Sequence, residues 1–125
     1  MDLERAGTMG VQLDRRQALD LWRLVTLEAV RSDEPDLTAR QLAVLMTVYL
    51  SPPPHTVRGL AATLDVTKPA ITRALDTLER YQLVRRKKDE EDLRNVLVQR
   101  TVRGSIYLTD FGDTIATRAN ALTAA

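Results

Sequence analysis

Two short amphipathic segments separated by only two residues occupy the middle of this 125-residue sequence. In the first, Thr56–Leu64, apolar residues recur at helical spacing behind an N-cap threonine. The turn Asp65-Val66 follows, and the second segment, Thr67–Tyr81, has another N-cap threonine and carries Pro69 in its first turn, where proline is tolerated. Because so short a turn forces the two helices together, the pattern predicts a helix-turn-helix over residues 56–81.

Two further helices are expected before this pair. Helical spacing of apolar residues predicts one over about Leu13–Val30. The other begins at the N-cap Thr38, with Gln41 three residues later completing a capping box. The proline-rich run Ser51–Pro54 ends it, and we interpret that run as a stiff loop.

The period of the pattern changes after the pair. Residues 83–87 are predicted to form one strand and the β-branched stretch 95–99 its partner, and the polar stretch between them is typical of a hairpin tip. A last helix is expected over about Thr101–Leu122, although Gly104 and Gly112 are unfavourable within it. The chain is therefore predicted to be mainly α-helical, with a small β-hairpin.

The composition argues against an enzyme. There is no cysteine, which excludes disulfides, thiol chemistry and cysteine-ligated metals, and the single histidine, His55, leaves a histidine-rich metal site or a Ser-His-Asp triad unsupported. We predict no catalytic residue, no metal and no cofactor. No apolar run approaches the length of a membrane span and the first ten residues lack the pattern of a signal peptide, so a cytoplasmic protein is expected.

Positive charge is concentrated in the middle of the chain. Residues 38–88 carry nine basic and three acidic side chains, whereas acidic residues outnumber basic ones on both sides. This imbalance is typical of an anion-binding surface, for which nucleic acid is the commonest partner, but a solvated helical face gives the same pattern. Charge alone leaves both interpretations open.

The order of elements and two motifs resemble the winged helix-turn-helix of the MarR (multiple antibiotic resistance) family of bacterial regulators. The stretch from Val57 to Glu79 is similar to that family's helix-turn-helix almost residue by residue. Asp92-Leu93-Arg94 matches its Asp-x-Arg motif, and Thr101–Gly104 matches most of the Leu-Thr-x-x-Gly that follows. The departure is Arg100, which stands where the family usually has leucine.

The resemblance implies a mainly α winged helix-turn-helix with a small β-hairpin wing and long N- and C-terminal dimerisation helices. It also implies a homodimer on a palindromic operator; a monomer whose terminal helices pack back on the lobe is the alternative. We interpret residues 1–125 as a single domain. Its expected parts are dimerisation helices at 11–31 and 102–122 and a DNA-binding lobe at 38–100, which contains the helix-turn-helix at 56–81 and the wing at 83–100.

The start of the second helix of the pair is the first candidate contact with double-stranded DNA. Helix-turn-helix proteins place this part in the major groove, where arginine pairs with guanine and threonine reaches base edges. On a helical wheel Ile71 and Leu75 face the core, and the opposite arc is free for DNA, although a merely solvated face shows the same pattern. The candidate residues are Thr67, Lys68, Pro69, Thr72 and Arg73.

The hairpin is the second candidate contact. Its first strand carries a basic run in which Arg86 and Lys88 are predicted to meet phosphates; the alternative is a hairpin edge that charge keeps soluble. The resemblance implies that Asp92 orients Arg94 and that Arg94 enters the minor groove, where a narrow groove attracts arginine. The acidic residues 89–91 are expected to form a solvated turn.

Three residues are candidates for binding a small aromatic or acidic effector: Trp22, Tyr49 and His55. The resemblance implies that such molecules bind between the dimerisation helices and the lobe. On their sequence context alone, Trp22 and Tyr49 are expected in the core and His55 in a loop.

Together these features predict a DNA-binding transcriptional regulator. Repression by occupying a promoter, and release by an effector, follow from the resemblance and not from any residue. The competing interpretations are a winged helix that binds protein without touching DNA, and an enzyme. Salt-dependent binding to duplex DNA separates the regulator from both.

Overall fold

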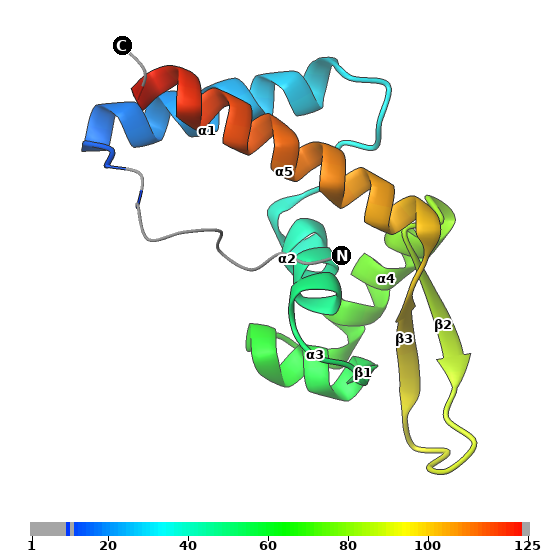
Figure 1. Ribbon diagram of the computed structural model, residues 1–125. Coiled ribbons are helices and arrows are strands. Elements are labelled where there is room, and N and C mark those ends of the chain that lie inside the picture. Colours follow the sequence, from blue (N-terminus) through cyan, green and yellow to red (C-terminus); the bar gives the residue numbers. More distant parts are fainter. Residues whose placement is uncertain (1–9, 11, 124–125) are drawn as a thin grey trace. The chain divides into compact units, whose positions relative to one another are not determined.

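The computed structural model describes residue 10 and residues 12–123, and it has five helices and three strands in that part of the chain (Figure 1). Val11, the first residue of the expected N-terminal dimerisation helix, lies outside the described residues. The chain divides into two units. We call residues 37–108 the lobe, and the described residues of 1–36 and 109–125 the helical pair. None of the helices described is both long and apolar enough to cross a membrane.

The helical pair consists of α1 (Arg15–Arg31) and most of α5 (Val102–Thr123). A capping box begins α1, because Asp14 accepts from the Gln17 amide at 2.8 Å while the Gln17 side chain accepts from the Asp14 amide at 3.0 Å. This cap places the start of α1 two residues later than the apolar spacing predicts. The two helices meet through an edge-to-face contact of Trp22 with Phe111 and an ion pair between Arg118 and Glu28.

One face of α1 remains apolar and exposed. Leu19 is 66% exposed, Trp22 47% and Val30 64%, and helical geometry places the three on the same side. The prediction that Trp22 is a core residue is therefore wrong within this chain. Apolar periodicity marks which face of a helix avoids water, but it does not tell whether the same chain covers that face.

The lobe contains α2 (Ala39–Leu50), α3 (Val57–Leu64) and α4 (Lys68–Arg80). The predicted threonine N-caps are all present, because Thr38, Thr56 and Thr67 each accept a hydrogen bond from an amide three residues later. Asp65 ends α3 in the left-handed conformation, which a short polar side chain tolerates, and this permits the two-residue turn into α4. The helix-turn-helix is thus formed as predicted.

A three-stranded antiparallel sheet in the order β1-β3-β2 completes the lobe, with β1 (His55–Thr56), β2 (Val84–Lys88) and β3 (Val96–Arg100). The hairpin β2–β3 is the wing (Figure 1). Its strands begin one residue later than predicted. The two-residue β1 was not predicted, and the expectation of a loop at His55 is wrong, because His55 pairs with Val98. A strand this short leaves no alternation in the sequence.

Helices and sheet of the lobe share one core. As predicted, the inward face of α4 is buried, and Tyr49, at 5% exposed, belongs to the same core. The completely or almost completely buried larger side chains of the lobe are Val44, Leu45, Val48, Leu60, Ile71, Leu75, Leu78, Leu83 and Val84.

Tyr49 also joins three distant segments of the lobe. Its hydroxyl donates to the Leu83 carbonyl at 2.7 Å and accepts from the Thr101 amide at 2.8 Å. Gly104, in the first turn of α5, packs against this hydroxyl so closely that a Cβ there would lie 1.9 Å from Tyr49 Oη. Glycine at 104 is therefore required by a close approach, and it does not interrupt the helix.

Candidate nucleic-acid interface

The first two turns of α4 present five predicted contact residues to solvent. Opposite them, Ala70, Ile71 and Ala74 are buried in the lobe. In the first turn of this helix Pro69 has no amide hydrogen and the Ala70 amide is bonded to the Thr67 cap, so the Lys68 amide and the helix dipole are what this end offers to a phosphate. The exposed residues are Thr67, Lys68, Pro69, Thr72 and Arg73.

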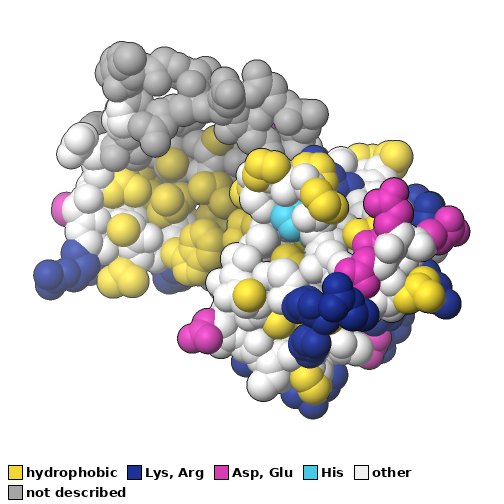
Figure 2. Space-filling model, turned by 90° about the horizontal axis from the view of Figure 1, so that it is seen from below, with side chains coloured by type: hydrophobic (Ala, Val, Ile, Leu, Met, Phe, Trp, Pro, Cys, Tyr) yellow, Lys and Arg dark blue, Asp and Glu magenta, His cyan; other side chains and the backbone are white. Residues whose placement is uncertain are grey.

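The charges needed for an anion are available on this surface. No ion pair engages the side chain of Lys68, Arg73 or Lys88 among the described residues, and all three are exposed. Figure 2 shows Lys and Arg side chains in several groups on one face, some of them beside acidic side chains. Arg73 projects from α4, and Lys88 stands at the outer end of β2.

The tip of the wing holds an arginine in a fixed geometry. Asp92 accepts from Arg94 Nε at 3.0 Å and from Arg94 Nη2 at 2.9 Å, yet the arginine side chain stays 74% exposed. The hydrogen bonds from the Arg94 side chain and amide, with a smaller contribution from the charge of Arg58 on α3, hold the pKa of Asp92 below its usual value. The pairing implied by the resemblance is therefore present.

The acidic turn before this pair has a structural role. Asp89 Oδ1 accepts from the amides of Glu91 at 3.0 Å and Asp92 at 3.3 Å, which folds the tip into an Asx-type turn. The expectation of a merely solvated turn is therefore incomplete at Asp89. The bond to the Asp92 amide helps to place the carboxylate that holds Arg94.

Arg86 is engaged differently from Lys88. Its guanidinium lies 2.7 Å from Asp76 and 2.8 Å from Glu79, both on α4, and its amide donates to Glu79 at 2.9 Å. In the sequence, Asp76 and Glu79 are two acidic residues three positions apart on the same helix. Nothing in their spacing reveals a partner on the following strand, because that contact depends on the angle between the helix and the wing.

Arg100, the departure from the family pattern, caps the end of α2. Its Nε donates to the Val48 carbonyl at 2.8 Å and its Nη2 to the Ser51 carbonyl at 2.9 Å, while the guanidinium lies 5.8 Å from the centre of the Tyr49 ring. A cation at a helix C-terminus is stabilised by the free carbonyls and the helix dipole. Leucine could not make these bonds.

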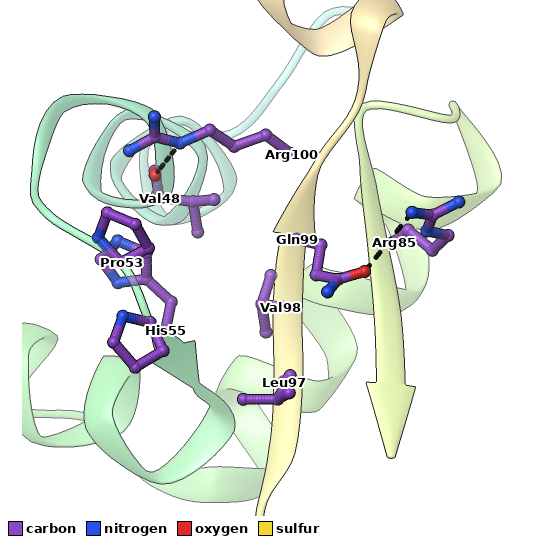
Figure 3. Close-up of a pocket in the computed structure, with 9 residues that line it drawn as sticks. Val48, Pro53, His55, Arg85, Leu97, Val98, Gln99 and Arg100 are labelled. Atoms are coloured by element: carbon purple, nitrogen blue, oxygen red, sulfur yellow. Dashed lines mark hydrogen bonds between the residues drawn. The ribbon is translucent and has the colours of Figure 1, made fainter. Parts of the chain in front are cut away.

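A half-open cavity of about 390 Å³ lies beside Arg100. Figure 3 shows Arg100 reaching from β3 toward Val48, while Arg85 and Gln99 approach one another on the strands. No carboxylate lines the cavity, so its polar groups are cationic or neutral. Its lining residues are Val48, Pro53, Pro54, His55, Arg85, Leu97, Val98, Gln99 and Arg100.

Of the three predicted effector residues, His55 lines this cavity. Its Nε2 donates to the Ser51 carbonyl at 3.1 Å. Tyr49 does not line the cavity, and its hydroxyl is occupied by Leu83 and Thr101. Trp22 belongs to the helical pair.

Comparison with known proteins agrees with this geometry. Residues 37–96 match the model of the MarR family. This segment is a MarR-family domain. It contains the whole helix-turn-helix and the wing as far as the start of β3, and proteins described as members of this family are transcriptional regulators. No curated protein matches the chain.

Solved structures of MarR-family proteins share the fold. A mutant of MepR from S. aureus bound to an oligodeoxyribonucleotide is 23% identical with a TM-score of 0.75, over 88% of this chain and 78% of that one. A MepR–DNA complex, also from S. aureus, is 22% identical with a TM-score of 0.61, over 82% and 76%. A mutant of MarR from E. coli is 27% identical with a TM-score of 0.67, over 86% and 77%.

Proposed function

We propose that the chain is a DNA-binding transcriptional regulator that places α4 in the major groove. The observation that carries the proposal is the pair of features on one lobe: an exposed polar N-terminal half of α4, and a wing arginine held outward by Asp92. Arg73 would meet a base edge, Thr72 would reach a neighbouring base, and Lys88 would meet a phosphate. The DNA-bound MepR structures, which share this fold, support the proposal.

The proposed role of the wing is to read the minor groove with Arg94. The ion pair with Asp92 restricts the guanidinium before DNA arrives, so less side-chain entropy is lost on binding. A narrow, A·T-rich minor groove has the most negative potential and would be preferred. Because α4 and the wing belong to one unit, one lobe would contact adjacent major and minor grooves.

The proposed active form is a homodimer in the cytoplasm, bound to a palindromic operator. The exposed apolar face of α1 supports this, because Leu19, Trp22 and Val30 would be covered by a second copy. Leu19→Lys places a charge in that face and should convert the dimer to monomers in light scattering. The same substitution at the equally exposed leucine of the wing tip, Leu93→Lys, should leave the mass unchanged. Equal masses for all three proteins would contradict this interface.

We further propose that the regulator is a repressor released by a small acidic effector. The cavity beside Arg100 supports this, because Val48 and Val98 give it apolar walls and the side chains of Arg85 and Arg100 give it positive charge. Benzoate is a suitable probe. It should lower operator affinity for the wild type, and Arg100→Leu should abolish that response. An identical response in both proteins would contradict the cavity as the effector site.

In vitro selection of bound duplexes from a random pool tests the function itself. The proposal expects a two-fold symmetric consensus whose binding weakens with salt. Absence of salt-dependent duplex binding would favour a protein-binding winged helix. Binding without any consensus would leave only a basic surface, which contradicts a regulator.

A further inference from the structure

Three charged side chains connect the wing to α4, and we call them the lock: Arg86, Asp76 and Glu79. Glu79 accepts from the Arg86 amide at 2.9 Å, from Nε at 3.2 Å and from Nη2 at 2.8 Å. Asp76, three residues earlier on the same face of α4, lies 2.7 Å from Nη2. The main chain and the side chain of one strand residue are thus both held by the helix.

The charge of the lock makes it a poor site for phosphate. One guanidinium and two carboxylates give it a net charge of −1. Hydrogen bonds from the Arg86 amide and side chain hold the pKa of Glu79 below its ordinary value of 4.5, so the Glu79 carboxylate is charged at neutral pH. Burial alone would lower the pKa of Arg86, but the bonds to Glu79 and Asp76 outweigh it and raise that pKa. A phosphate would have to displace partners that already fit.

The lock lies where it can control the direction of the wing. The root of the wing is fixed by the buried side chains of Leu83 and Val84 and by the bond from the Leu83 amide to the Leu78 carbonyl at 2.9 Å. Arg86 is two residues further out, on the same face of β2 as Val84, and the hairpin continues from there to Arg94. The lock is a second attachment beyond the root, and it restricts rotation of the hairpin about the root.

We propose that Arg86 is a positioning residue, which holds the wing at a fixed angle to α4 so that Arg94 and the start of α4 reach their two grooves together. The inference rests on the proposed DNA binding, and it assigns Arg86 no contact with DNA. Asp76 and Glu79 are its partners in this role. Disrupting the lock therefore uncouples the two halves of the interface while leaving the contact residues unchanged.

A matched pair of variants separates this role from simple electrostatics. Asp76→Asn combined with Glu79→Gln removes the two carboxylates of the lock and keeps Arg86. Glu90→Gln combined with Glu91→Gln removes the same two charges at the wing tip, where neither side chain forms an ion pair among those described. Arg86→Lys is the third variant, because it keeps the charge but loses the fork that bonds both carboxylates.

Hydrogen exchange of the wing amides without DNA is the first measurement. In the lock variant the β2 and β3 amides should exchange about tenfold faster, as expected for the loss of charge-assisted hydrogen bonds. Arg86→Lys should be intermediate, and the tip control and the α2 amides should match the wild type. Unchanged wing exchange in the lock variant would overturn the inference. This result does not depend on DNA, so it stands even if the proposed function fails.

A double-mutant cycle with Arg94→Ala on the selected operator is the second measurement. In the wild type and the tip control, Arg94→Ala should weaken binding about tenfold. In the lock variant it should weaken binding about threefold or less, because a wing that is no longer held in place contributes little to wild-type affinity. If Arg86 is a phosphate contact, freeing it should instead raise affinity, steepen the salt slope by about 0.9 and leave the cost of Arg94→Ala unchanged. That outcome would refute the positioning role.

Discussion

Two glycines in α5 should respond in opposite directions to the same substitution. A Cβ added at Gly112 would have no neighbouring atom within 4 Å. Gly112→Ala should therefore stabilise the protein by about 0.5–1 kcal/mol through helix propensity alone. Alanine at Gly104 would place Cβ 1.9 Å from Tyr49 Oη and 2.3 Å from the Leu83 carbonyl oxygen. Neither separation is compatible with van der Waals contact.

The magnitude at Gly104 follows from what must move. Overpacking of a close contact costs about 1–3 kcal/mol. Displacing the Tyr49 hydroxyl leaves the Leu83 carbonyl and the Thr101 amide without their bonds, at about 1–3 kcal/mol for each group that stays buried. After the gain in helix propensity, Gly104→Ala should lower the free energy of unfolding by about 2 kcal/mol or more.

Urea unfolding followed by circular dichroism, at one protein concentration for all variants, measures both changes. Tyr49→Phe provides a further check, because removing the hydroxyl leaves Tyr49 Cζ at 2.6 Å and the Leu83 oxygen at 2.3 Å from the added Cβ. It should therefore fail to rescue Gly104→Ala. If Gly104→Ala is as stable as Gly112→Ala, the close approach of Gly104 to Tyr49 is not a feature of the folded protein.

The remaining predictions concern DNA and pH. Arg94→Ala should weaken operator binding by about 1–3 kcal/mol in fluorescence anisotropy, and equal affinities would remove Arg94 from the interface. Arg73→Ala should weaken binding to the operator by a similar amount and binding to random DNA by much less. Lys88→Ala should weaken binding to both duplexes and flatten the slope of log affinity against log salt by about one. Equal losses of affinity on both duplexes for Arg73→Ala would make Arg73 a phosphate contact. Because the folded-state pKa of Glu79 is lowered, its stabilising effect is present above pH 4.5 and is lost as pH falls through the folded-state pKa. The difference in free energy of unfolding between pH 6 and pH 3 should therefore be smaller in Glu79→Gln than in the wild type, as measured by urea unfolding at both pH values.

Local features of this fold were readable from the sequence because their partners are close along the chain. Thr38, Thr56 and Thr67 bond to amides three residues away, so a cap signal and an apolar period together locate the helices. The face of α4 follows from the same period. For this reason the exposure of the candidate residues on α4 could be predicted, and the ion pair of Asp92 with Arg94 also joins residues that are close in sequence.

The features that escaped prediction depend on contacts between distant segments. The two residues of β1 become a strand only because β3 is beside them. Arg100 departs from the family pattern in the sequence, but its hydrogen bonds reach carbonyls at the end of α2, about 50 residues earlier. The partners of Arg86 depend on the angle of the wing, which no periodicity in the sequence encodes.

The position of Trp22 gives the molecule a built-in spectroscopic probe. It is the chain's single tryptophan, and it lies in the helical pair, half exposed and packed edge-on against Phe111. Its emission wavelength therefore reports how far water reaches the exposed face of α1. Association through that face would exclude water from the indole ring, so the emission should shift to the blue as protein concentration rises, without any label.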